Sequence, residues 1–242
     1  MSTARFLTAE WRWLVMLNYE VDPSVLKRFI PAGTELDAWE GKTFVSMVGF
    51  QFLKTRVGGW TIPFHSNFEE VNLRFYVRRQ TKEGWRRAVV FIKELVPRLA
   101  IAWTARTFYN ENYISLPMSH LVETGTDGGP SRVAYRWMFR GQANHLEIQT
   151  TGESSPVREG SEEEFITEHY WGYARQRDGG TVEYQVEHPR WRVWPAQKTT
   201  FAGDVTGLYG AEFAPFLLRP PSSAFLADGS EVAVHQGTRL PS

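Results

Sequence analysis

Residues 68–78 read Phe-Glu-Glu-Val-Asn-Leu-Arg-Phe-Tyr-Val-Arg, with polar and apolar side chains in alternation. Successive side chains of a β-strand point to opposite faces of a sheet. The stretch is therefore expected to form a strand with one apolar row that packs in a core. Its other row consists of Glu70, Asn72, Arg74 and Tyr76.

Extended segments surround this strand on both sides. Residues 11–19, 42–52 and 88–96 are rich in aromatic and β-branched side chains, which favour strands. Later in the chain, strands are expected at residues 118–123, 132–140, 146–151 and 181–188. Residues 224–239 are expected to close as a hairpin that turns at Asp228-Gly229.

Helices are expected at a few places between the strands. Pro23–Phe29 follows the capping residue Asp22, and residues 99–110 carry apolar side chains at helical spacing. Ser161 with Glu164 forms a capping-box pattern, and residues 204–218 are expected to be partly helical. Nine or ten strands with two or three helices predict an α+β fold that is mostly antiparallel β. We expect a twisted sheet or partly closed β-barrel that encloses a cavity, with the helices at its periphery.

The composition narrows the classes of function. The 242 residues include 27 Lys and Arg, 27 Asp and Glu, and no Cys. Zero net charge predicts no nucleic-acid partner, and the absence of cysteine excludes disulfides and thiolate metal sites. We expect a single domain, residues 1–242, since there is no repeat or linker. No secretory signal or membrane-spanning apolar run is found, so the expected location is the cytoplasm, without a membrane partner.

The polar row of residues 68–78 is the first candidate site. If this face lines a cavity, Glu70 offers a carboxylate for acid–base work, and Asn72, Arg74 and Tyr76 offer groups that bind a substrate. The alternative is a half-exposed strand with a solvated polar face. The aromatic residues, 10 Trp, 16 Phe and 9 Tyr, either wall such a cavity or simply fill a core.

Lys93 and Glu94 interrupt an apolar strand at neighbouring positions, so one of them is expected to face inward. An inward Lys93 would supply an amine, whereas an inward Glu94 would be a second acid–base candidate. The alternative is a buried structural ion pair. His169, His188 and His235 have no metal-ligand spacing, so neither a metal nor a cofactor is predicted.

Several longer segments carry a resemblance to known families. Residues 91–97, 109–113, 165–173 and 186–194 resemble the uncharacterised YqjF-like family, also called DUF2071, and this likeness extends over nearly the whole chain. Residues 13–37 and 100–113 are similar to the acetoacetate decarboxylases, a likeness confined to the first half of the chain. The resemblance implies the acetoacetate-decarboxylase-like fold and a small-molecule ligand.

Individual residues carry over unevenly from the decarboxylases. Arg12 and Glu70 fall where that family has an active-site arginine and an active-site glutamate. Glu111 and Tyr113 fall where the family builds its site, although they could equally just end a helix. Ile114, Ser115 and Leu116 follow Tyr113, so no lysine stands where that family has its catalytic pair. Because an imine needs a primary amine, the decarboxylase reaction is not expected.

Three functions therefore stay open. The first is an acid–base enzyme acting on an acidic or carbonyl-containing organic molecule, with Arg12 and Arg74 on the anion and Glu70 or Glu94 moving a proton. The second is a non-catalytic ligand-binding protein, and the third is a structural or interaction protein whose interior is filled by aromatic rings. A homo-oligomer is compatible with all three.

Overall fold

The computed structural model describes residues 4–61, 65–97, 112–126 and 128–241. Strands dominate it, as predicted. They are β1 (Arg5–Val21), β2 (Glu35–Leu36), β3 (Thr43–Val57), β4 (Trp60–Thr61), β5 (Phe68–Thr81), β6 (Gly84–Val96), β7 (Tyr113–Ser115), β8 (Met118–Thr124), β9 (Pro130–Phe139), β10 (Gln142–Thr150), β11 (Ser155–Pro156), β12 (Trp171–Arg175), β13 (Thr181–Glu187), β14 (Arg192–Ala202), β15 (Ser223–His235) and β16 (Thr238–Arg239). The helical segments are η1 (Pro23–Phe29), α2 (Glu162–Thr167), α3 (Val205–Leu208), η2 (Ala211–Phe213) and α4 (Ala214–Leu217).

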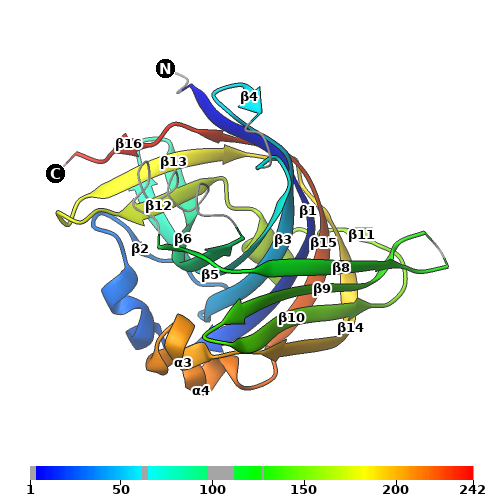
Figure 1. The fold of residues 1–242 in the computed structure, drawn as a ribbon. Coiled ribbons are helices and arrows are strands. Elements are labelled where there is room, and N and C mark those ends of the chain that lie inside the picture. The colour runs from blue at the N-terminus through cyan, green and yellow to red at the C-terminus, as the bar shows by residue number, and fades with distance from the viewer. Residues whose placement is uncertain (1–3, 62–64, 98–111, 127, 242) are drawn as a thin grey trace.

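Within the described part of the chain, seven strands form a closed ring in the order β1, β3, β5, β6, β12, β13 and β15 (Figure 1). Neighbouring strands of the ring run antiparallel except β6 and β12, which are parallel. A short seam closes the ring where Val186 pairs with Val234 and Glu187 with Ala233. The predicted α+β architecture, a twisted sheet that curls around an interior, is confirmed.

A second layer covers part of the outer face of the ring. Strands β14, β10, β9 and β8 continue the sheet beyond β15 and pack back on the ring (Figure 1). Gly49 of β3 permits the close approach, because a Cβ atom there would lie 2.6 Å from Cδ2 of Tyr135. Tyr135 also donates a hydrogen bond to the carbonyl of Trp13, at 2.9 Å. The larger core therefore lies between these two layers, outside the ring.

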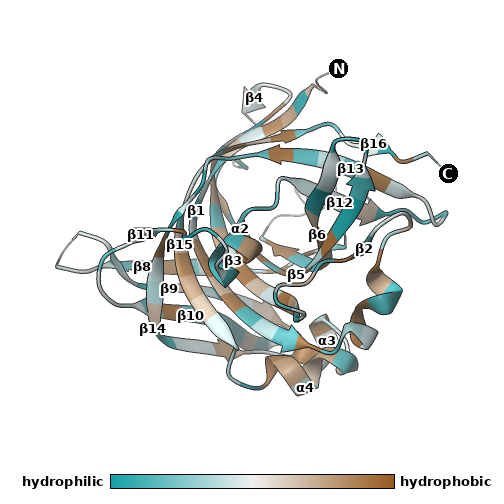
Figure 2. Cartoon of the chain, turned by 180° about the vertical axis from the view of Figure 1, so that it is seen from behind, coloured by the Kyte–Doolittle hydropathy of each residue, from teal (hydrophilic) through white to brown (hydrophobic). Residues whose placement is uncertain are grey.

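The inside of the ring holds a second core, which is closed at one end by α2 (Figure 2). Phe165 of this helix packs on Phe44 of β3 and on Tyr76 of β5. The Ser161 hydroxyl accepts a hydrogen bond from the Glu164 amide, at 3.2 Å, which confirms the predicted helix cap. The Glu164 side chain accepts from the amide of Gly160, at 2.8 Å, in place of the Ser161 amide that a complete capping box would use. Because α2 fills only one end, the rest of the interior is left for other side chains or for a ligand.

Some predicted elements differ in the structure. The hairpin expected at residues 224–239 is wrong, since β15 runs unbroken through Asp228 and Gly229. Gly229 serves a close backbone approach instead of a turn: its φ is 78°, and a Cβ atom there would lie 2.0 Å from the carbonyl oxygen of Trp11. The helix expected at residues 99–110 lies outside the described residues.

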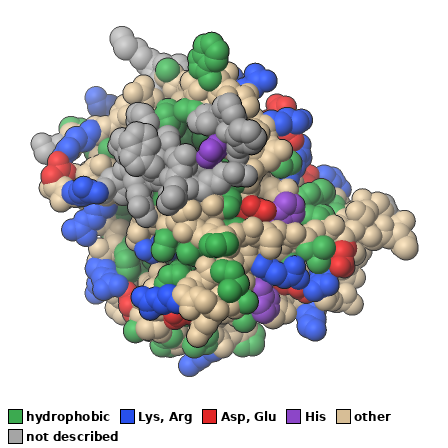
Figure 3. All heavy atoms as spheres, in the orientation of Figure 1, with side chains coloured by type: hydrophobic (Ala, Val, Ile, Leu, Met, Phe, Trp, Pro, Cys, Tyr) green, Lys and Arg blue, Asp and Glu red, His purple; other side chains and the backbone are tan. Residues whose placement is uncertain are grey.

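The surface matches the balanced composition. Positive and negative side chains are interspersed over the face seen in Figure 3. None of the helices in the described residues has the length and apolar character needed to span a membrane.

Candidate functional site

A cavity of about 170 Å³ lies inside the ring, beyond the end filled by α2. Most of its wall is apolar and aromatic, which is the usual character of a small-molecule pocket. Strands on several sides of the ring contribute rings to this wall: Trp11, Phe50, Phe52, Phe68, Trp171 and Tyr184.

Polar side chains from three adjacent strands meet at this cavity. Glu70, Asn72 and Arg74 line it from β5, Glu94 from β6 and Tyr113 from β7. Asn72 pairs with Glu94 in the β5–β6 ladder, and Glu94 pairs with Tyr113 in the β6–β7 ladder. Sheet pairing therefore brings together residues that are far apart in the sequence.

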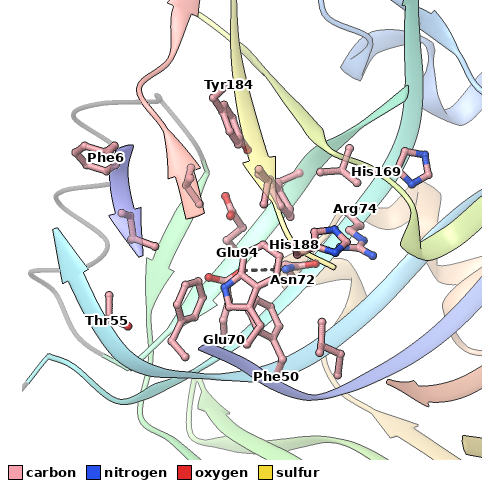
Figure 4. A pocket seen from close by; sticks show the side chains of 18 of the residues that line it. Phe6, Phe50, Thr55, Glu70, Asn72, Arg74, Glu94, His169, Tyr184 and His188 are labelled. Atoms are coloured by element: carbon pink, nitrogen blue, oxygen red, sulfur yellow. Dashed lines mark hydrogen bonds between the residues drawn. The ribbon is translucent and has the colours of Figure 1, made fainter. Parts of the chain in front are cut away.

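Glu70 is held by its neighbours in a fixed position. The Asn72 side-chain amide donates to its Oε1 at 2.9 Å, the contact drawn dashed in Figure 4, and the Tyr113 hydroxyl donates to its Oε2 at 3.5 Å. Only 2% of Glu70 is exposed, and burial raises its pKa to about 7 against the opposing pull of these hydrogen bonds and of the Arg74 charge. A carboxyl group with this pKa can both accept and donate a proton at neutral pH.

Arg74 is a buried cation without a carboxylate partner among the described residues. It is 7% exposed, its Nη2 donates to the carbonyl of Ile166 at 3.3 Å, and its Nε has no hydrogen-bond partner within the described ranges. Buried charges are normally paired, because an unpaired charge is costly to desolvate. The guanidinium is therefore available to a ligand's anionic group.

Three histidines also line the cavity, His65, His169 and His188, and the last two lie next to Arg74 in Figure 4. The ring of His169 packs 4.7 Å from Tyr76, and the ring of His188 stacks 4.4 Å from Trp191. Burial lowers the pKa of both, that of His169 strongly with the help of nearby arginine charges, so both favour the neutral form. Sequence reasoning considered these histidines only as metal ligands, and no metal-binding group forms among the described residues.

A β-bulge decides which of Lys93 and Glu94 faces the cavity. Leu73 pairs with Lys93 but Arg74 pairs with Phe91, so Ile92 is an extra residue in β6. Phe91 and Glu94 consequently both line the cavity, and Glu94 is only 1% exposed. The Lys93 amine instead donates to Oδ1 of Asn112 at 2.8 Å. All six lysines of the chain lie in the described ranges, and none of them lines the cavity.

The structure separates Arg12 from the cavity-lining residues. Its guanidinium contacts Glu10 and the carbonyl of Gly229, at 3.3 Å in each case. The pairing of β1 with β3 shifts just after Arg12, where Trp13 has a φ of 56°. Because of this irregularity, Trp11 and Leu14 face the cavity and Arg12 does not.

Tyr76 and Glu111 complete the set of candidates. Tyr76 is buried behind the cavity wall, where its hydroxyl is 2.6 Å from Oγ of Ser46 and its ring packs on α2. It supports Arg74, whose guanidinium lies 5.8 Å from its ring centre. Glu111 lies outside the described residues.

Sequence comparison finds relatives along most of the chain. The DUF2071 family, described as an uncharacterized conserved protein, matches residues 8–231. The uncharacterized protein YqjF of Bacillus subtilis (strain 168) is 27% identical over 201 residues, which cover 83% of this chain and 80% of that protein.

Structural comparison finds a shared fold. The enduracididine biosynthesis enzyme MppR, solved in complex with pyruvate, superposes with a TM-score of 0.72 at 14% identity over 100% of this chain and 92% of that chain. An acetoacetate decarboxylase-like enzyme from Sphingomonas wittichii RW1 gives 0.69 at 13% identity, covering 99% and 94%. Acetoacetate decarboxylase from Legionella pneumophila gives 0.67 at 12%, covering 98% and 88%. At these identities the likeness shows the fold alone.

Proposed function

The chain belongs to the DUF2071 family, and for this member we propose that the cavity binds a small organic molecule with an anionic or carbonyl group and exchanges a proton with it. The observation that carries the proposal is the buried group formed by Glu70, Glu94 and Arg74 at the wall of an otherwise apolar cavity. In this arrangement Arg74 holds the anionic group and Glu70, with a pKa of about 7, moves the proton.

Unpaired polar atoms around the cavity support a polar ligand. Among the described residues, no hydrogen-bond partner is found for the buried atoms Trp11 Nε1, Thr55 Oγ1, Asn72 Oδ1 and Arg74 Nε, and all four residues line this cavity. Leaving one such atom unpaired costs about 1–3 kcal/mol, so buried polar groups are nearly always bonded. A ligand with hydrogen-bonding groups would satisfy several of them at once.

The absence of a cavity lysine separates this proposal from decarboxylase chemistry. Without an amine at the wall, the cavity cannot hold a carbonyl compound as an imine. One fold neighbour was solved with pyruvate, and a small keto acid is a ligand of the class proposed here.

The non-catalytic binding protein remains the second candidate, because the same residues would anchor a ligand without any reaction. The cavity argues against the third candidate, a structural or interaction protein whose interior is filled by aromatic rings. The cytoplasm stays the expected location.

Binding can be tested with keto acids and the tryptophans of the cavity wall. Pyruvate, acetoacetate and 4-methyl-2-oxopentanoate would be titrated against the full chain, with intrinsic fluorescence as the readout, since Trp11, Trp171 and Trp191 line the cavity. We expect saturable quenching by at least one probe and a tenfold or greater loss of affinity in Arg74→Met. Arg177→Met is the matched control, because Arg177 is exposed and away from the cavity.

Exchange of a probe's hydrogen for deuterium distinguishes an acid–base enzyme from a non-catalytic binding protein. In D₂O, an acid–base site removes the proton next to the probe's carbonyl and returns deuterium, which proton NMR detects. Glu70→Gln should abolish this exchange while leaving binding measurable. Binding without exchange favours the non-catalytic candidate, whereas the absence of saturable binding for every probe would refute the proposed function for ligands of this size.

A further inference from the structure

We propose that the ligand is a zwitterion, with a carboxylate on Arg74 and an ammonium group against Glu70, Asn72 and Glu94. The inference rests on the proposed function, in which the ligand carries an anionic group. It adds that the same ligand also carries a cationic group, which the proposed function does not require. It narrows the ligand class from organic acids to small amino-acid-like molecules.

The charges at the cavity wall carry the first part of the argument. Among the described residues that line the cavity, Glu70 and Glu94 each carry a carboxylate, whereas Arg74 alone carries a guanidinium. A ligand with a lone carboxylate would bring a third acidic group into a water-poor space, where like charges repel strongly. A ligand that also carries an ammonium group adds no net charge and places a cation beside the two acidic side chains.

The hydrogen-bonding pattern carries the second part. Because the Asn72 Nδ2 atom donates to Glu70, the orientation of its amide is fixed and the Oδ1 atom is left as an acceptor. This Oδ1 is buried and has no hydrogen-bond partner in the part of the chain that the structure describes. Glu94 stands next to Asn72 in the ladder and is a second source of acceptor oxygens. An ammonium group, with three N–H donors, matches this wall, whereas the oxygen of a keto acid offers it no donor.

The aromatic wall adds to the preference for a cation. Rings attract an ammonium group over their faces, and the attraction grows when water is excluded. Trp11 and Phe50, which lie in edge contact at 5.3 Å between ring centres, belong to the same cavity as Glu70. Aromatic rings and carboxylates therefore favour the same charge.

Four probes of one shape isolate the two charged groups. Leucine has both, 4-methylpentanoate has only the carboxylate, 4-methyl-2-oxopentanoate has a carbonyl in place of the ammonium, and 3-methylbutylamine has only the ammonium. Calorimetric titration of the full chain at pH 7 should show leucine binding at least tenfold more tightly than any of the other three. Glu94→Gln should remove most of the preference for leucine over 4-methylpentanoate, whereas Glu159→Gln, at an exposed site, should keep it.

The number of protons taken up when a probe binds tests the role of Glu70 directly. A side chain that only stabilised the fold would not make this number differ between probes. Asn72 and Arg74 on its own strand and Glu94 and Tyr113 on the next two are the polar neighbours of Glu70, and His65, His169 and His188 line the same cavity. Titrations at pH 7 in buffers of different ionisation enthalpy should show 4-methylpentanoate binding with uptake of about half a proton, because Glu70, with a pKa of about 7, is already half protonated in the free chain. Leucine should bind with clearly less uptake, because its ammonium group lets the acidic side chains stay ionised.

Each outcome decides between the two proposals. Equal or tighter binding of either acid compared with leucine would overturn the zwitterion and leave the proposed function standing. Tightest binding of the amine would overturn the zwitterion and the assigned role of Arg74. No binding of any probe would overturn both at this ligand size. Thermal melting of each variant shows whether a loss of binding comes from unfolding.

Discussion

Replacing Glu70 with glutamine should remove a pH-dependent loss of stability. The carboxyl group titrates at about 7 in the folded chain and at an ordinary value of 4.5 when unfolded. Below pH 4.5 both states hold the proton, so the free energy of unfolding has its full value there. Between pH 4.5 and 7 the unfolded chain releases the proton while the folded chain keeps it, so stability falls as the pH rises.

The size of the effect follows from the two pKa values. The difference is 7 − 4.5 = 2.5. At 1.36 kcal/mol for each pKa unit, the total is about 3 kcal/mol. Glutamine has no proton to lose, so Glu70→Gln should gain about 3 kcal/mol relative to the natural chain between pH 4 and pH 8.

Urea unfolding, followed by tryptophan fluorescence at each pH unit from 4 to 8, measures this difference directly. Other titrating groups cancel when the two chains are compared at the same pH. Glu159→Gln, which changes an exposed carboxylate, should show a flat difference over the same range. A flat difference for Glu70→Gln would mean that Glu70 titrates near its ordinary value, and it would then have no role as a proton donor at neutral pH.

Three further substitutions test the packing around the site. Gly172→Ala would place a Cβ atom 2.2 Å from Cζ of Tyr184, so this ring must shift at the cavity wall; we expect about a tenfold change in probe affinity by calorimetry. Glu183→Gln leaves two arginines without their shared carboxylate, and urea unfolding should show a loss of about 2 kcal/mol, less than the ~3–5 kcal/mol for breaking a fully buried pair because the arginines are partly exposed. Gly49→Ala meets Tyr135 at 2.6 Å and should cost about 1–3 kcal/mol without changing the pH profile.

The regular part of the site could be predicted from the sequence. Alternation along β5 puts Glu70, Asn72 and Arg74 on one face, and the structure has all three at the cavity wall. The prediction works because β5 has no irregularity between these residues, so backbone geometry alone decides where each side chain points. The resemblance to DUF2071 is likewise confirmed.

The remaining parts depend on local irregularities that side-chain patterns do not reveal. Arg12 was expected in the cavity, but the shift at Trp13 turns it away. Asp228-Gly229 has the composition of a hairpin turn, yet the glycine is needed because β1 and β15 approach closely. His169 and His188 were noted, but only as poor metal ligands, since nothing in their spacing shows that the ring closes around them.

The bulge in β6 has the largest chemical consequence, and it can be tested. Alternation counted from Val89 and Phe91 would put Lys93 in the cavity; the extra residue Ile92 puts Glu94 there instead. One inserted residue therefore makes the cavity wall acidic where a strand without it would offer an amine.

The natural chain, incubated with acetoacetate and reduced with borohydride, should form no adduct at Lys93, because its amine is held outside by Asn112. In the double variant Lys93→Glu, Glu94→Lys, the amine would enter an apolar cavity that lowers its pKa, and peptide mapping should find an adduct at position 94. An adduct at Lys93 in the natural chain, or none in a double variant that melts as a folded protein, would refute the assignment of the bulge as the feature that selects the carboxylate.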